Sequence, residues 1–188
     1  KLNVTQSGHE VLNFIGNEWI KPSGDQFDVI SPYTGSVCGH SYNSTKSDID
    51  KAVEMASENQ KTWAATPLKA RTAVLFKFRN ILLEEISQIA AIVALENGKT
   101  IPEASAGIMK GIEVLEYALS LQNADVGGRM EVSRGVYCEY KREALGVVAS
   151  ITPFNFPAMV PMWTIPIAIA CGNAYVWKPS EKTPLTSK

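Results

Sequence analysis

Hydrophobic positions along the chain change their spacing twice, and each change predicts a different kind of structure. Between residues 13 and 41, short aromatic and β-branched runs are separated by Gly16-Asn17, Ser23-Gly24 and Thr34-Gly35. Dipeptides of this kind are typical of tight turns between antiparallel strands. We therefore expect β-hairpins in the first part of the chain.

From Ser47 onward the apolar residues recur at helical spacing. Ser47 and Asp50 have the spacing of a capping box, which predicts a first helix that runs to about Ala65. A second helix is expected from Pro67 to Asn97-Gly98, where glycine favours a left-handed end. Its apolar stripe is formed by Leu75, Phe78, Leu82, Ile86, Ile89 and Val93.

A second capping-box spacing, Thr100 to Glu103, predicts the start of a third helix. Its buried face is expected to consist of Ile108, Ile112, Leu115 and Leu119. Polar and apolar residues then alternate around Arg134-Gly135, which indicates an exposed hairpin. A two-stranded ribbon is marginally stable alone, so a partner subunit is one candidate for its support.

The most unusual pattern is the absence of charge from Ala144 to Trp177, a run that contains prolines at 153, 157, 161 and 166. A membrane span is disfavoured because so many helix breaks would leave backbone groups unsatisfied in lipid. Strands buried on both faces of a parallel sheet give continuous apolar runs. We therefore expect buried strands at 146–152 and 174–178, joined by a buried helix within 157–172, in an α/β fold.

Composition and charge indicate a globular protein and argue against several classes of partner and site. The chain has 188 residues, 45% hydrophobic and 20% charged, as in a globular protein with a core. Its net charge of -1, with both signs interleaved, argues against nucleic acid or an anionic membrane surface as a partner. Three cysteines without a Cys-x-x-Cys pair predict neither a disulfide framework nor a metal site, and fit a reducing, cytoplasm-like compartment.

The uncharged segment is also where chemistry is expected. Its first strand ends at Ile151-Thr152 and leads into Pro153-Phe154-Asn155, at the sheet edge where open α/β proteins bind ligands. Glu181 follows the second strand, near the place of the acidic residue that binds an adenosine ribose in dinucleotide sites, and Lys178 lies beside it. The Gly-x-Gly-x-x-Gly turn is missing, so spacing alone leaves nucleotide binding open.

Two separated motifs, "ITPFNFPAMVPMW" and "ACGNAYVWKPSEKTP", resemble the aldehyde dehydrogenase superfamily, and the first is most similar to its CoA-acylating methylmalonate-semialdehyde branch. "NFIGNEWI", "SPYTG" and "ENGKTIPEA" occur in the same order. The resemblance implies an α/β fold with an atypical Rossmann dinucleotide-binding domain. Residues 1–125 would form its amino-terminal part, 126–144 an oligomerisation hairpin, and 145–188 the start of the Rossmann-like β-α-β unit, with the catalytic domain outside this chain.

The resemblance also implies residue roles. Asn155 would donate its side-chain amide to the oxyanion of a thiohemiacetal; the alternative is an asparagine that bonds its own turn. The residues expected at the cofactor are Thr152 and Phe154 against the dinucleotide, Lys178 and Glu181 at the ribose, and Lys182 as a neighbour. For Glu181 and Lys182, the alternative is a solvated charge pair before a helix that starts at Thr183-Pro184. A carboxylate at Glu181 would repel a 2′-phosphate, which favours NAD over NADP.

The implied reaction is NAD-dependent oxidation of a small aldehyde, (methyl)malonate semialdehyde, to an acyl-CoA through a thioester. The nucleophilic cysteine would lie beyond Lys188, so we expect an amino-terminal part of a longer homo-oligomeric enzyme, cytoplasmic or in the mitochondrial matrix of a eukaryote. Lys110 stands where an arginine would hold the substrate carboxylate, which leaves the aldehyde open, because arginine and lysine are not equivalent there. The alternatives are a hydrolytic aldehyde dehydrogenase and a truncated, non-catalytic binding paralogue.

Five other side chains are of types that often have catalytic or binding roles, but we expect each of them to have a structural or surface role. Cys171 has no adjacent base and is expected to be a small buried core residue. His9 and His40 lack a partner in the sequence pattern and are expected at the surface. Met159 and Met162 are interpreted as core-filling residues.

Overall fold

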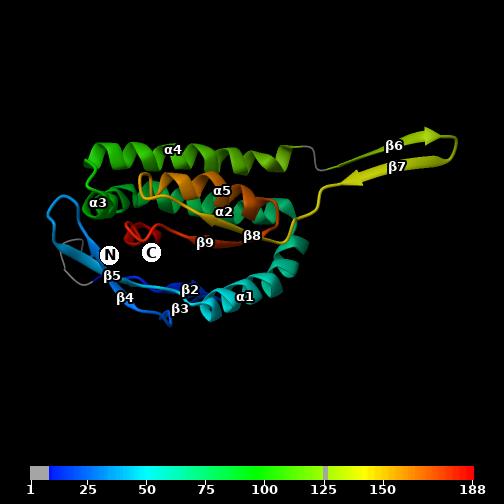
Figure 1. Ribbon diagram of the computed structural model, residues 1–188. Coiled ribbons are helices and arrows are strands. Elements are labelled where there is room, and N and C mark those ends of the chain that lie inside the picture. Colours follow the sequence, from blue (N-terminus) through cyan, green and yellow to red (C-terminus); the bar gives the residue numbers. More distant parts are fainter. Residues whose placement is uncertain (1–8, 125–126) are drawn as a thin grey trace.

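Helices, a central strand pair and a projecting ribbon form the main parts of the computed structural model, which describes residues 9–124 and 127–188. Figure 1 shows helices α2 to α5 on one side of strands β8 and β9, with α1 and the first strands on the other side. Strands β6 and β7 extend away from both layers. The expected domain boundary at 125–126 lies outside the described residues.

The amino-terminal strands form two small sheets. The strands are β1 (His9–Glu10), β2 (Asn13–Ile15), β3 (Glu18–Ile20), β4 (Gln26–Ile30) and β5 (Val37–Tyr42). The β2–β3 hairpin is confirmed, with positive φ at both turn residues, Gly16 (62°) and Asn17 (68°). Strands β4 and β5 are antiparallel, as expected, but β1 joins β5 in parallel, a pairing that the turn signals did not predict.

Helix α1 (Lys46–Ala65) ends as predicted, whereas its expected capping box was wrong by two residues. The cap is Thr45, whose side chain pairs with the amide of Asp48 while the Asp48 carboxylate accepts from the Thr45 amide. Asp48 also accepts hydrogen bonds from the amide and hydroxyl of Ser23, at 3.1 and 2.9 Å. This contact with a distant turn favours the earlier cap over Ser47-Asp50.

The second predicted helix is two helices, α2 (Leu68–Glu84) and α3 (Ile86–Asn97). Glu85 has φ −101° and ψ 8°, outside the helical range, and this residue breaks the axis. The expected stripe is not buried along its whole length: Leu75 and Val93 are buried, but Phe78 is exposed. The predicted end at Gly98 is confirmed, with a left-handed φ of 79°.

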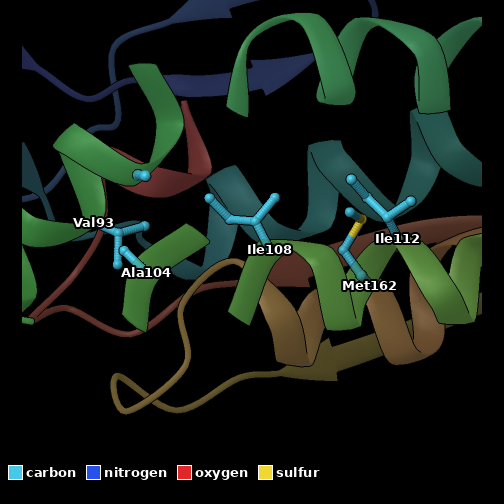
Figure 2. Close-up of a cluster of buried hydrophobic side chains, with 6 residues drawn as sticks. Val93, Ala104, Ile108, Ile112 and Met162 are labelled. Atoms are coloured by element: carbon cyan, nitrogen blue, oxygen red, sulfur yellow. The ribbon is translucent and has the colours of Figure 1, made fainter. Parts of the chain in front are cut away.

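Helix α4 (Ile101–Ser120) begins at the predicted Thr100–Glu103 capping box and buries the predicted face; a short 3₁₀ turn (Leu121–Asn123) follows it. It packs against α5 (Met159–Ala170) through Ile108, Ile112 and Met162, as Figure 2 shows. A Cβ atom at Gly111 would lie 3.0 Å from the Met162 Cβ, so glycine permits this close approach. The buried Met162 confirms the interpretation as core filling.

The uncharged segment forms the expected β-α-β unit. Strands β8 (Val147–Ile151) and β9 (Ala174–Lys178) are parallel, and α5 connects them. They are only partly buried, contrary to expectation, because neither edge has a further strand among the described residues. After Thr183-Pro184, where a helix is expected to start, residues Leu185–Ser187 form a 3₁₀ turn. Within residues 9–124 and 127–188, no helix is both long and apolar enough to cross a membrane.

The remaining strands, β6 (Gly127–Ser133) and β7 (Val136–Lys141), form the predicted hairpin around Arg134-Gly135. Both strands are exposed along almost their entire length. The ribbon therefore has no supporting layer within the described part of the chain (Figure 1).

Candidate active site

The predicted site residues follow the carboxyl ends of the two parallel strands, and the strand register brings them together. Ile151 at the end of β8 is paired with Lys178 at the end of β9, and the Thr152 amide donates to the Lys178 carbonyl at 3.1 Å. The loop with Phe154 and Asn155 therefore begins beside the loop with Glu181. Their side chains lie at one edge of the sheet, where ligands of open α/β folds bind.

Thr152 is buried, and its hydroxyl is already engaged. The Trp177 indole N–H donates to the Thr152 Oγ1 at 2.8 Å. This bond joins the end of β8 to β9, so the side chain holds the two strands together. Its hydroxyl only accepts in this bond, so the O–H can still donate to a ligand, whereas its backbone amide is already bonded to Lys178.

Charged side chains surround the start of the second loop, and one of them contacts an aromatic ring of the first loop. Lys178 and Glu181 form an ion pair with an N–O distance of 3.2 Å, and both side chains are more than half exposed. The Lys182 ammonium lies 4.6 Å from the ring centroid of Phe154. A backbone hydrogen bond and the Lys178 pair keep the pKa of Glu181 below its usual value, so this carboxylate is ionised at neutral pH.

Asn155 is exposed on the loop between β8 and α5. Among the hydrogen bonds of the described residues, none uses its side-chain amide, so the alternative of an asparagine that bonds its own turn is not observed. Its backbone is held instead: Lys99 donates to the Asn155 carbonyl, and Asn97 donates to the Phe154 carbonyl at 2.7 Å. The Asn155 side-chain amide is therefore free to bind a ligand, while hydrogen bonds from Asn97 and Lys99 hold the backbone of its loop.

The residues present fit a dinucleotide that lacks a 2′-phosphate. An ionised Glu181 can accept hydrogen bonds from two ribose hydroxyls but would repel an added phosphate. The glycine-rich phosphate turn is replaced by the proline-containing loop of residues 153–158, which ends at the uncapped start of α5. Lys178 and Lys182 supply the nearby positive charge.

One charged residue that the sequence analysis did not single out, Glu96, is almost completely buried, with 2% of its surface exposed. Its carboxylate accepts from the amides of Leu185 and Thr186, both at 2.7 Å, and from the Thr186 hydroxyl. Burial raises the pKa of Glu96 to about 7, against the effect of these donors. Glu96 begins the "ENGKTIPEA" motif, but the local pattern does not predict its burial, because its partners lie 89 and 90 residues away.

Two expectations about other side chains, those for Cys171 and His40, need correction. Cys171 is exposed, because it caps the end of α5, where the chain turns at the surface. His40 has a partner, since its Nδ1 lies 2.9 Å from an Asp28 oxygen. Lys110 is exposed and bonds both oxygens of Glu113 at 2.9 Å. No cluster of metal-ligating side chains occurs in residues 9–124 and 127–188.

Residues 19–188 match the aldehyde dehydrogenase family. The chain belongs to this family. It is 42% identical over 181 residues to a malonate-semialdehyde dehydrogenase of Halalkalibacterium halodurans, covering 95% of this chain and 37% of the relative. The chain therefore spans less than two-fifths of the length of that relative.

Solved structures agree with this aldehyde dehydrogenase fold and confirm the expected α/β class. A protein assigned as methylmalonate-semialdehyde dehydrogenase from Sinorhizobium meliloti 1021, complexed with NAD, superposes with a TM-score of 0.91 at 36% identity. The methylmalonate-semialdehyde dehydrogenase of Oceanimonas doudoroffii gives 0.92 at 32% identity. Each match covers 95% of this chain and 37% of the solved one.

Proposed function

We propose that the complete gene product oxidises a small aldehyde with NAD, and that this chain supplies part of the NAD site and the oxyanion donor. The observation that carries the proposal is the convergence of Asn155, Glu181 and Lys182 at one sheet edge, with the Asn155 amide unused. Family membership and the NAD complex of a related structure support it.

In this proposal each residue has a separate task. The Glu181 carboxylate accepts hydrogen bonds from the adenosine ribose, while Lys178 and Lys182 border the same site. Bound NAD supplies the hydride acceptor. The Asn155 amide donates to the oxygen of the aldehyde as it gains negative charge, and a preorganised donor of this kind lowers the barrier by about 3 kcal/mol.

The finer proposal is a malonate or methylmalonate semialdehyde as substrate and CoA as the acyl acceptor, through a thioester on a cysteine outside this chain. It is supported by the names of the similar proteins. Lys110 can attract a carboxylate as a point charge, although its present partner is Glu113. The three unpaired cysteines support a reducing, cytoplasm-like compartment.

Calorimetric titration of NAD into the protein tests the cofactor site. We expect Glu181→Ala to weaken binding about 10- to 100-fold, the effect of losing hydrogen bonds to a charged group. Asp50→Ala is the matched control, because Asp50 is also an exposed, lysine-paired carboxylate. Equal affinity of the Glu181→Ala protein and the wild type would contradict the ribose role. Assays with and without CoA then separate acyl transfer from hydrolysis.

A further inference from the structure

One turn, Glu96-Asn97-Gly98-Lys99, contacts both loops of the proposed site. Glu96 holds the backbone at Leu185 and Thr186, after β9. Asn97 and Lys99 hold successive carbonyl groups after β8, those of Phe154 and Asn155. The turn is far from these loops in sequence, and the family resemblance assigned it no role.

The two carbonyl contacts fix the backbone on both sides of one residue. The Phe154 carbonyl belongs to the peptide group before the Cα of Asn155, and the Asn155 carbonyl belongs to the group after it. A peptide group is planar, so tying both groups restricts both backbone torsions of Asn155. With both backbone torsions restricted, the Cα–Cβ bond of Asn155 has a set direction, and this direction limits the region that its unbonded side-chain amide can reach.

The surroundings of Lys99 suit it to holding the backbone of Asn155 in place. Its ammonium lies 3.5 Å from the ring centroid of Phe156, the residue after Asn155. It is half-buried, and this burial lowers the pKa of Lys99, with a smaller opposite effect of Glu103. The Glu103 carboxylate is occupied by the Thr100 cap. Lys99 is therefore held against the loop after β8 by its hydrogen bond to the Asn155 carbonyl and its cation–π contact with Phe156.

The shape of the turn depends on Gly98. Its φ of 79° is in the left-handed region, and a Cβ atom there would lie 3.0 Å from the Pro32 Cγ. Glycine lets the chain reverse between α3 and α4, so that the side chains on either side of it reach the same loop. Asn97 and Lys99 therefore act from a rigid connection between two packed helices.

We propose that Asn97 and Lys99 are positioning residues for Asn155, and that they aim its amide at the reacting carbonyl oxygen. The inference rests on the proposed function, because it presumes that Asn155 donates to the substrate. A positioning residue affects catalysis only through the group that it positions, so its substitution should have no effect once that group is removed. A residue with a general structural role would lower kcat in both backgrounds.

The test is a double-mutant cycle on kcat for NAD-dependent aldehyde oxidation by the complete gene product. Lys99→Met should lower kcat about 10-fold, because small misplacements of a catalytic group are costly. Lys99→Arg retains the donor and the charge, and it should recover kcat to within about threefold of the wild type. In an Asn155→Ala background, Lys99→Met should have almost no further effect.

The possible outcomes separate the inference from the function. If Asn155→Ala lowers kcat and Lys99→Met multiplies that loss, Lys99 does not act through Asn155 and the inference is wrong. If Asn155→Ala leaves kcat unchanged, the proposed oxyanion role fails, and the inference fails with it. Lys46→Met, at an exposed ion-paired lysine, is the control for loss of a surface charge. If Lys99→Met does not fold, Asn97→Leu enters the same cycle with the same criteria.

Discussion

The environment of Glu96 shows how one buried side chain can link two distant parts of this protein. The carboxylate lies on α3 and accepts three hydrogen bonds from the turn after β9. It is also close enough to Cys38 that its negative charge, after burial, contributes to the raised pKa of that thiol. Glu96 therefore joins α3, the carboxyl-terminal turn and the first sheet in one low-dielectric environment.

This environment predicts a pH-dependent stability. The folded-state pKa of Glu96 is about 7, above the usual 4.5, so the folded protein binds this proton more tightly than the unfolded chain. The stabilising contribution is complete below about pH 4.5 and is lost as pH rises to about 7, with a total on the order of 3 kcal/mol. Glu96→Gln cannot titrate and should remove this part of the pH dependence.

Urea unfolding of both proteins at about pH 5 and about pH 8 measures the effect, because other titrating groups cancel in the difference. The free energy of unfolding of the wild type, relative to the Glu96→Gln protein, should fall between the two pH values. A difference that stays constant with pH would show that Glu96 has an ordinary pKa in the folded state.

The sequence could predict where Asn155 and Glu181 lie in the fold, but it could not predict the burial of Glu96. Asn155 and Glu181 lie in motifs next to predicted strands, so their place at the sheet edge follows from local pattern. The partners of Glu96 are mainly backbone amides, which every residue carries and which leave no signal in the sequence. His40 was misjudged for a similar reason, since its partner Asp28 lies on the neighbouring strand.

At the scale of elements, the end of α5 depends on side chains from two other helices. Arg71 on α2 donates its Nε to the Ala170 carbonyl at 2.9 Å, and its Nη1 to the carbonyls of Ala64 and Thr66. Trp63 on α1 donates to the Ile169 carbonyl at 2.9 Å. The last carbonyls of a helix have no partner within the helix, so these donors satisfy both α5 and α1.

We expect Arg71→Met to lower the free energy of unfolding by about 3 kcal/mol, because three carbonyls of partly buried helix ends lose a charged donor. Arg71→Lys should restore less than half, since one ammonium cannot reach all three carbonyls. Arg79→Met on the same helix is the control: Arg79 pairs with Glu116 at the surface and should contribute about 1 kcal/mol or less. Chemical denaturation monitors all three variants. Equal losses for Arg71→Met and Arg79→Met would contradict this role.

Prediction of whole elements succeeded where a local signal specified the boundary. Gly98 marks the end of α3 and the Thr100–Glu103 box marks the start of α4, and both boundaries were predicted correctly. The break at Glu85 has no proline or glycine, so the continuous apolar spacing of α2 and α3 predicted one helix. The start of α1 is set by the contact of Asp48 with Ser23, which depends on tertiary structure and not on spacing.

For the whole molecule, the β6–β7 ribbon is notable because both of its strands are exposed along almost their entire length. Directly paired residues share a face, so Met130 and Cys138 lie on one side, while Arg129 and Glu139 lie on the other. One face is therefore apolar and exposed, and the other is charged. A two-stranded ribbon with an uncovered apolar face is marginal by itself, so we propose that it associates with a second copy of the chain, in line with the oligomerisation hairpin expected from the sequence.

Sedimentation velocity tests this proposal. Met130→Lys places a charge on the apolar face, and burying that charge unpaired in an interface is costly, so we expect the oligomer to dissociate to smaller species. Glu139→Lys introduces the same side chain on the charged face and should leave the oligomeric state unchanged. Because both positions are exposed, neither change should alter the thermal unfolding of the separated subunit. An unchanged sedimentation coefficient for Met130→Lys would exclude the apolar face of the ribbon as the interface.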